Sequence, residues 1–164
     1  MATAFFYHND CLEHETGEDH PETPKRLEVI LELLKLNEFK SLVLVEAQMA
    51  DLSLLNLVHS KEYISELYDH SPFTDLINLD ADTVLSSGTL VAARRAVGAV
   101  CDAVDYVLDS SYRNAFCAVR PPGHHARYNM GMGFCIFNNI AVGAKYAQVF
   151  KKVDRVAVID FDVH

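Results

Sequence analysis

The sequence has few basic residues and no apolar run long enough to span a membrane. Of its 164 residues, 14 are Lys or Arg and 23 are Asp or Glu, so the formal net charge is -9. This acidic balance argues against a general nucleic-acid or anionic-membrane surface and is compatible with cationic substrates. No apolar stretch reaches the ~20 residues of a spanning helix, and residues 1–8 lack the basic and apolar regions of a signal peptide. We therefore expect a soluble, cytoplasmic protein with no direct binding to nucleic acid or membrane.

The chain also lacks closely spaced cysteines and any internal repeat, low-complexity tract or linker. Its four cysteines lie far apart, and three of them fall in apolar segments where a thiol packs as a small hydrophobic group. We expect reduced thiols at these positions, which are Cys11, Cys101, Cys117 and Cys135. With 50% hydrophobic residues and no internal division, the chain is expected to build one core.

Apolar periodicity predicts strands and helices that alternate along the chain. Short apolar runs predict strands at residues 3–7, 42–45, 115–119 and 156–161. Helical spacing predicts helices at residues 24–37, with Thr23 as N-cap, after a cap at Ser60, and at residues 88–108 and 138–150. Residues 8–20 have no period and are expected to form a loop, and residues 70–82 look irregular. This alternation predicts an α/β fold with a mostly parallel sheet flanked by helices.

The last five residues carry three metal-capable side chains at alternate positions, directly after an apolar run. In an extended strand, Asp160, Asp162 and His164 would share one face. A buried strand holds two carboxylates and an imidazole on one side only if a metal, a partner or a ligand compensates for their desolvation. The segment therefore indicates a cation site. The alternative is a strand that ends near Ile159 and leaves the acidic residues in a solvated loop.

A second candidate segment, Arg-Pro-Pro-Gly-His-His-Ala, follows the strand expected at residues 115–119. Its two prolines restrict the backbone and Gly123 frees the turn, so the loop holds His124 and His125 in a definite place. Without that frame, adjacent histidines would more often be ordinary solvent-exposed residues. Ligands in open α/β sheets collect outside the carboxyl ends of strands, and both candidate segments lie at such ends. We expect the two segments to face one cavity.

Asp and His side chains around an open coordination position suit a catalytic Zn²⁺, or Fe²⁺ in a related geometry. Such an ion lowers the pKa of bound water and polarises a carbonyl. An imidazole near its usual pKa of ~6.5 can take the water proton and later deliver one to a leaving amine, especially if a carboxylate orients its other nitrogen. Asp160 is placed to be that carboxylate, which leaves Asp162 and His164 as metal ligands. A catalytic zinc normally takes three protein ligands, and these are only two.

Three segments in this order resemble the motifs of the zinc-dependent histone deacetylase family: RPPGHHA at residues 120–126, MGFCIFNN at residues 132–139 and IDFDVH at residues 159–164. Residues 20–27 and 79–83 resemble the early loops of its class II and bacterial deacetylase-like branch, so the resemblance covers essentially the whole chain. It implies the arginase/deacetylase fold, incomplete here, with residues 1–164 as the N-terminal portion of a single domain. It also implies hydrolysis of an N-acetyl amide in acetyl-lysine or an acetylpolyamine.

The resemblance assigns roles to the two candidate segments position by position. His124 and His125 match the tandem catalytic histidines of the family, and Asp160 matches the carboxylate that hydrogen-bonds the first of them. Asp162 and His164 match zinc ligands. By the same resemblance, the backbone carbonyls of Asp160, Asp162 and His164 contribute to a structural K⁺ site.

The resemblance also points to a substrate tunnel and its rim. Gly133 and Phe134 match residues that line the narrow tunnel for the acyl-amine side chain, although plain core packing is an alternative for Phe134. Asp82 is the best match for an acidic residue at the rim that fixes the substrate backbone, and Asp80 is the second. Cys135 lies beside this tunnel, where packing accounts for it, since a nucleophilic role needs a base that the motif does not provide.

The chain departs from the family pattern at its end. The family's third zinc ligand, an aspartate, and the tyrosine or histidine that stabilises the oxyanion lie downstream of the metal-binding strand, and this chain contains neither. We expect a fragment that is inactive alone, in preference to an incomplete gene product or a split protein. The alternatives are a catalytically inactive binding module and an arginase-like ureohydrolase with two manganese ions. The remaining histidines are expected in surface or capping roles: His8, His14, His20, His59 and His70.

Overall fold

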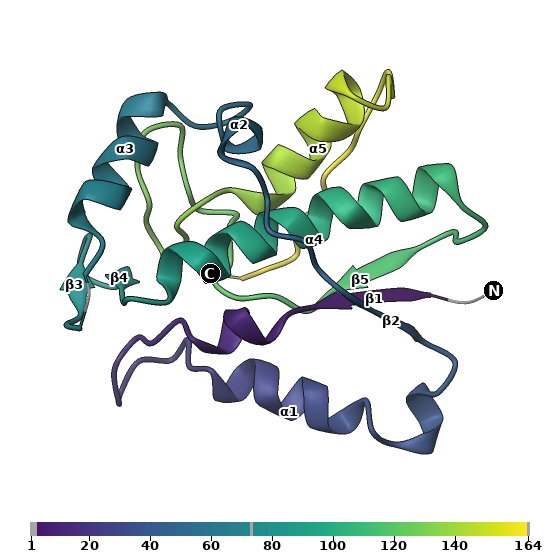
Figure 1. Cartoon of the computed structure of the whole chain (residues 1–164), viewed down its shortest axis with the longest axis horizontal. Coiled ribbons are helices and arrows are strands. Elements are labelled where there is room, and N and C mark those ends of the chain that lie inside the picture. Colours follow the sequence, from purple (N-terminus) through teal and green to yellow (C-terminus); the bar gives the residue numbers. More distant parts are fainter. Residues whose placement is uncertain (1–2, 73, 164) are drawn as a thin grey trace.

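The sheet of the protein has three parallel strands and lies between helices (Figure 1). The computed structural model describes residues 3–72 and 74–163. Strand β1 (Ala4–Tyr7) is central, with β2 (Val43–Glu46) along one edge and β5 (Ala115–Cys117) along the other. Parallel neighbours need long crossover connections, and the segments between these strands contain helices. The predicted α/β architecture is thereby confirmed.

Helices and a short two-stranded sheet make up the other elements of the described residues. In chain order they are the 3-10 helix η1 (Asn9–Leu12), α1 (Lys25–Leu33), the 3-10 helix η2 (Asn37–Phe39), α2 (Leu52–Leu55), α3 (Lys61–His70), β3 (Ile77–Asn78), β4 (Val84–Leu85), α4 (Thr89–Asp109) and α5 (Asn139–Val149). Helix α1 covers one face of the sheet, α4 covers the other, and α5 packs against α4 (Figure 1). Not one of the helices described is both long and apolar enough to cross a membrane.

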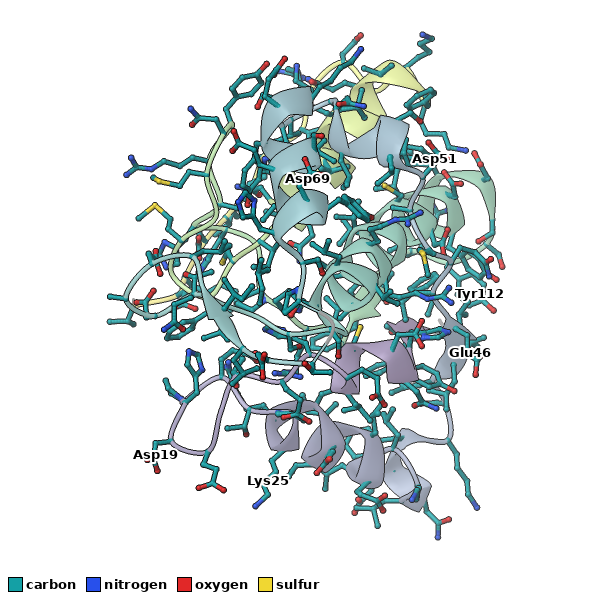
Figure 2. The ribbon with its side chains drawn as sticks, turned by 60° about the vertical axis from the view of Figure 1, so that its left-hand side comes forward. Asp19, Lys25, Glu46, Asp51, Asp69 and Tyr112 are labelled. Carbon is teal, nitrogen blue, oxygen red and sulfur yellow. The ribbon has the colours of Figure 1, made fainter. Side chains whose placement is uncertain are left out.

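The side chains of the central strand β1 alternate between the two faces of the sheet, and both faces are covered by helices. Phe6 packs in a cluster with Ala99 of α4, and Phe5 packs in a cluster with Leu27 of α1. The exposed fractions of these two phenylalanines are 0% and 5%. Burial of each ring contributes about 1.5–3 kcal/mol. Charged side chains such as Asp19 project outward from the ribbon (Figure 2).

Helix α4 approaches the backbone after β2 closely at Gly98. A Cβ at this position would lie 1.8 Å from the carbonyl oxygen of Gln48, and a backbone atom cannot swing away as a side-chain end can. We expect Gly98→Ala to lower the free energy of unfolding by about 1–3 kcal/mol, even though alanine is the better helix former. Urea unfolding followed by circular dichroism measures this change.

The control for this prediction is Val91→Ala on the same helix, where the side chain is 39% exposed. It should change the free energy of unfolding by less than about 0.5 kcal/mol. A Gly98→Ala protein as stable as the parent would show that α4 can move away from Gln48 without cost.

One of the two predicted caps is right and the other is wrong, and the structure adds a cap at Asn138 that was not predicted. Ser60 accepts a backbone N–H at the start of α3, and Asn138 does the same at the start of α5. Thr23 does not cap α1, because Pro24 occupies the N-cap position and provides no side-chain hydrogen bond. The same helix ends at Leu33 and does not continue to residue 37, where the 3-10 helix η2 begins.

Three expected segments also differ from the structure. The expected loop at residues 8–20 contains η1, whose Cys11 is fully buried, and the irregular stretch 70–82 contains β3. The strand expected at residues 156–161 does not form, and Ile159 and Phe161 are 85% and 91% exposed. A buried parallel strand needs hydrogen-bonding neighbours and cover on its faces. Among residues 3–72 and 74–163, no strand pairs with this segment, so the expected strand is wrong.

Candidate active site

The loop after β5 lines a cleft of about 930 Å³ that brings several predicted site residues together. Four separate stretches of the chain contribute to it, namely the loop before α1 with the first turn of that helix, the turn before β4, residues 122–134 around and after the tandem histidines, and the C-terminal segment. Its lining residues are Pro21, Arg26, Asp80, Ala81, Asp82, Pro122, His124, His125, Met132, Gly133, Phe134 and Asp162. Asp160 contacts His124 beside this cleft, and the predicted ligand His164 lies outside the described residues.

His124 pairs with Asp160 as the sequence predicts. The Nδ1 atom of His124 lies 2.9 Å from Oδ2 of Asp160, whose other oxygen accepts the N–H of Asp162 at 3.1 Å. The hydrogen bond from Asp162 and then that from His124 lower the pKa of the Asp160 carboxyl. The carboxylate is therefore ionised and can only accept, so His124 carries its proton on Nδ1. Its Nε2 atom faces Asp162, 4.0 Å from Oδ2 of that residue.

His125 stands beside His124, and Gly133 leaves the space that its ring occupies. The two imidazole centroids are 4.1 Å apart. A Cβ on Gly133 would lie 2.7 Å from Cδ2 of His125, so a larger residue would collide with the imidazole. The φ angle of Gly133 is +56°, which also favours glycine. Cys135 is fully buried nearby, and burial raises the pKa of its thiol to about 11. This thiol packs as a neutral group, in line with the packing role expected for it.

Two polar side chains, one of them fully buried, hold the loop that follows the tandem histidines. The Nδ2 atom of Asn138 donates to the carbonyl of Ala126 at 3.0 Å. Nε2 of His59 accepts the N–H of Asn138 at 2.9 Å, so its Nδ1 atom donates to the carbonyl of Arg127, also at 2.9 Å. Burial lowers the pKa of His59 and favours this neutral form. The surface position expected for His59 is wrong, since the residue is 1% exposed.

A buried ion pair fixes the beginning of the same loop. Arg120 donates from Nη2 to Oε2 of Glu22 at 2.7 Å and from Nε to Oε1 at 2.8 Å. The guanidinium also donates to the carbonyls of Cys11 and His14, both at 2.9 Å. Arg120 is 3% exposed and Glu22 is 1% exposed. The pair joins the histidine loop to the segment before α1, and sequence reasoning missed it because neither residue stands out without its partner.

His14 is buried next to this ion pair, which makes its expected surface role wrong as well. Its Nδ1 atom lies 2.8 Å from Oγ1 of Thr89. Burial, followed by the charges of Arg120 and His20, lowers the pKa of His14 from 6.5 to about 3. Its Nε2 atom is 3.8 Å from Oε2 of Glu22, which is too long for a hydrogen bond, so Glu22 does not offset the effect of burial.

This depressed pKa predicts that the protein loses stability as the pH falls. In the unfolded chain His14 binds a proton below pH ~6.5, whereas in the folded protein it stays neutral down to about pH 3. The contribution is complete above pH ~6.5 and decreases as the pH drops from ~6.5 towards 3, by up to ~1.4 kcal/mol per pH unit. We expect His14→Gln to give a shallower dependence of the urea midpoint on pH between about pH 7.5 and about pH 5.

His70→Gln is the matched control for this measurement. His70 lies at the exposed C-terminal end of α3, and its ring bonds only locally, to the carbonyl of Glu66. Its removal should leave the pH dependence of stability as in the parent. Parallel curves for His14→Gln and the parent would contradict the buried neutral state of His14.

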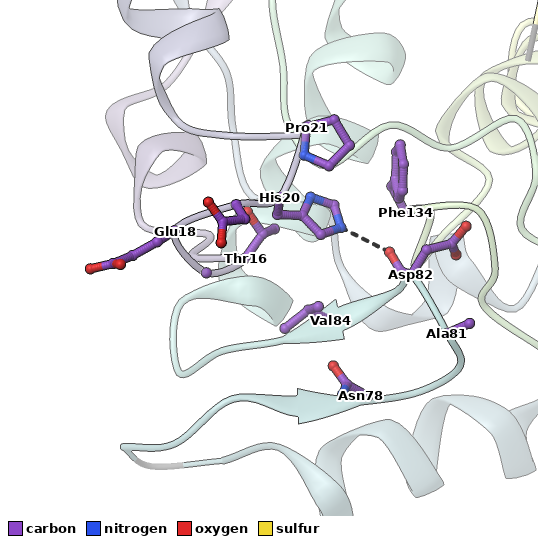
Figure 3. A pocket seen from close by; sticks show the side chains of 11 residues that line it. Thr16, Glu18, His20, Pro21, Asn78, Ala81, Asp82, Val84 and Phe134 are labelled. Carbon is purple, nitrogen blue, oxygen red and sulfur yellow. Dashed lines mark hydrogen bonds between the residues drawn. The ribbon is translucent and has the colours of Figure 1, made fainter.

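The tunnel candidate Phe134 and the rim candidate Asp82 line both the cleft and a neighbouring pocket, which Figure 3 shows. The ring of Phe134 meets His20 edge-on, with centroids 4.8 Å apart, and Nε2 of His20 donates to the carbonyl of Asp82 at 3.0 Å. Asp82 is exposed and lines the cleft. Asp80 accepts N–H groups from Asp82 and Thr83 in its own turn, at 3.0 and 2.7 Å. Asp82 is therefore the better placed of the two for a role at the rim.

A metal ion would need ligands beyond those described. Within residues 3–72 and 74–163, no three His, Cys, Asp or Glu side chains converge as a group that could hold an ion. Asp162 contributes a carboxylate of the right chemistry at the cleft, with its side chain 52% exposed. The donor set of the described residues fits part of a zinc or iron site, and the second predicted ligand is His164, outside them.

These observations define a parallel α/β domain with a cleft lined by tandem histidines and acidic residues. The histone deacetylase domain matches residues 20–164, and the chain belongs to the histone deacetylase family. It is 36% identical to "Type-2 histone deacetylase 2" of Dictyostelium discoideum, across 99% of this chain and 12% of that protein. It is 34% identical to "Polyamine deacetylase HDAC10" of Homo sapiens, across 100% of this chain and 26% of that protein.

A solved structure agrees with these relatives. The crystal structure of the HDA15 HD domain superposes with a TM-score of 0.84 and 31% identity, over 91% of this chain and 43% of that chain. The fold implied by the motifs is thereby confirmed, and the class II-like branch suits these relatives. The chain spans less than half the length of each of the three proteins compared.

Proposed function

We propose that this chain supplies part of the active site of a metal-dependent amide hydrolase that removes acetyl groups from acetyl-lysine or related acetylated amines. The observation that carries the proposal is the pairing of His124 with Asp160 beside a cleft that also contains His125 and Asp162. Deacetylases among the relatives support the reaction class. Residues 1–164 would form the N-terminal portion of a single deacetylase-like domain, which fits the share of each relative that the chain covers.

The proposed chemistry divides between proton transfer and a metal. His124 and His125 take a proton from the attacking water and return one to the leaving amine. Asp160 keeps His124 in the tautomer that exposes Nε2 as a base, and it stabilises the imidazolium that forms. Asp162 and His164 would hold Zn²⁺, or Fe²⁺, which supplies a water of lowered pKa and polarises the acetyl carbonyl. The family resemblance also suggests a structural K⁺ on the backbone carbonyls of the C-terminal segment.

The rest of the cleft would bind the substrate. Gly133 and Phe134 would line the tunnel, where a flat aromatic ring suits the methylenes of an acylated amine. Asp82 would contact the substrate at the rim. An exposed carboxylate there suits a substrate with amide N–H or ammonium groups, such as an acetyl-lysine peptide or an acetylpolyamine.

The test is acetate release by the native polypeptide that contains this sequence. We expect it to release acetate from an acetyl-lysine peptide or a monoacetylated diamine, to lose this activity with a chelator and to regain it with zinc. Binding of the acetylated peptide without acetate release would favour the inactive binding module. Urea release from a guanidine substrate, with two manganese ions per chain, would favour the arginase-like alternative.

A further inference from the structure

The cleft residue Phe134 has a backbone conformation that needs support. Its φ angle is +68°, after +56° at Gly133. A positive φ is uncommon for a residue with a side chain and persists where the surroundings enforce it. The N–H of Phe134 donates to Oγ1 of Thr83 at 3.1 Å, across 51 residues of sequence. The hydroxyl of Thr83 therefore holds the proposed tunnel wall in place.

Thr83 is itself fixed in a tight turn. It is 0% exposed, its N–H donates to Oδ1 of Asp80 at 2.7 Å, and its carbonyl accepts the N–H of Leu79 at 2.8 Å. Because its oxygen accepts from Phe134, its one hydroxyl proton is free to donate, and it does so to Oδ1 of Asp82 at 3.2 Å. A single buried hydroxyl thus connects the wall of the cleft to the carboxylate at the rim.

A second contact connects the same two residues independently. The Nε2 atom of His20 donates to the carbonyl of Asp82, while its ring packs edge-on against Phe134 (Figure 3). The Nδ1 atom of His20 accepts the N–H of Glu22 at 3.0 Å, which fixes the ring orientation. The main chain of Asp82 is therefore anchored by His20, and its carboxylate is oriented by Thr83.

We propose that Thr83 is a positioning residue for substrate binding. Its hydroxyl fixes the position of the Asp82 carboxylate relative to the Phe134 ring. An acetylated amine therefore binds between side chains that are already ordered. This inference rests on the proposed function, because it assigns Thr83 a role in binding the same substrates. Thr83 does not line the cleft and acts through its two neighbours.

The test compares Thr83→Val with Thr83→Ser in the native polypeptide. Valine has the shape of threonine without the hydroxyl, so the N–H of Phe134 loses its acceptor and the Asp82 carboxylate loses its donor. We expect KM for an acetyl-lysine peptide to rise about 5- to 50-fold, with kcat changed less than about 3-fold. The reason is that Asp82 and Phe134 must then be ordered when the substrate binds, which costs binding free energy. Thr83→Ser should recover most of the lost affinity. A general structural defect would lower kcat or the active fraction instead.

A double-mutant cycle with Asp82→Ala checks the route of the effect. If Thr83 acts through Asp82, Thr83→Val raises KM by a smaller factor in the Asp82→Ala background than in the parent. Equal factors in both backgrounds, or an unchanged KM in Thr83→Val, would overturn the proposal. Thr83→Ala replaces the valine variant, with the same expectation, if the latter does not fold. A parent polypeptide that neither binds nor deacetylates acetylated amines would instead overturn the proposed function.

Discussion

His124→Ala is expected to lower kcat for acetate release by the native polypeptide by about 10²–10⁴-fold, the usual contribution of a general acid or base. The reason is the geometry at His124, whose Nδ1 is oriented by Asp160 so that Nε2 would serve as the base in the proposed reaction. KM should change little, because the imidazole mainly serves the transition state. Initial acetate release over a range of peptide concentrations separates kcat from KM. His70→Ala, at an exposed position of α3, is the matched control and should behave as the parent.

The same reasoning predicts strong coupling between His124 and Asp160. Asp160→Ala alone should lower kcat, since it removes the acceptor that sets the tautomer of the imidazole. In the His124→Ala background, the same substitution should add almost nothing, because residues that act as a unit are not additive. Multiplicative losses in the double variant would show that Asp160 acts independently of His124.

Glu22→Gln is expected to lower the free energy of unfolding by about 3–5 kcal/mol, the largest stability change predicted for this chain. The substitution leaves the buried Arg120 guanidinium without its anionic partner, and there is no solvent contact to compensate. Guanidinium chloride unfolding measures the change. Glu18→Gln, an exposed acid in the same loop, should stay within about 0.5 kcal/mol of the parent.

The double variant Glu22→Met, Arg120→Met distinguishes charge burial from general packing. Removing both charges removes both desolvation penalties, so the double variant should be more stable than Glu22→Gln alone. The contradicting result is a double variant whose loss in free energy of unfolding equals the sum of the losses in the two single variants. It would show that the pair contributes through its shape and its hydrogen bonds to the carbonyls, and not through its charge.

Local patterns predicted much of the fold, because the signals concerned lie within a few residues of each other. The continuous apolar run of β1 reflects burial on both faces, and the predicted cap Ser60 marks the start of α3 through a bond to the N–H three positions on. The strand expected at residues 156–161 is wrong because its formation depends on contacts with residues far away in the sequence. An apolar run specifies burial only if a neighbouring strand and cover are present, and the described residues provide neither to Ile159 or Phe161.

The candidate site divides in the same way. The resemblance of the motifs to a family located His124, His125, Asp160 and Asp162, and the structure brings these residues to one region. The supporting contacts escaped prediction because each joins residues far apart in sequence. Arg120 donates to Glu22 across 98 residues of sequence. The residues next to either one give no indication of which side chain it contacts.

The most direct test of the central claim is anomalous diffraction at the zinc edge from crystals of the native polypeptide grown with zinc and an acetylated amine. The proposed function predicts one strong peak bonded to Asp162 and His164, inside the cleft and beside His124 and His125. A peak elsewhere, with Asp162 and His164 directed away from the tandem histidines, would contradict it.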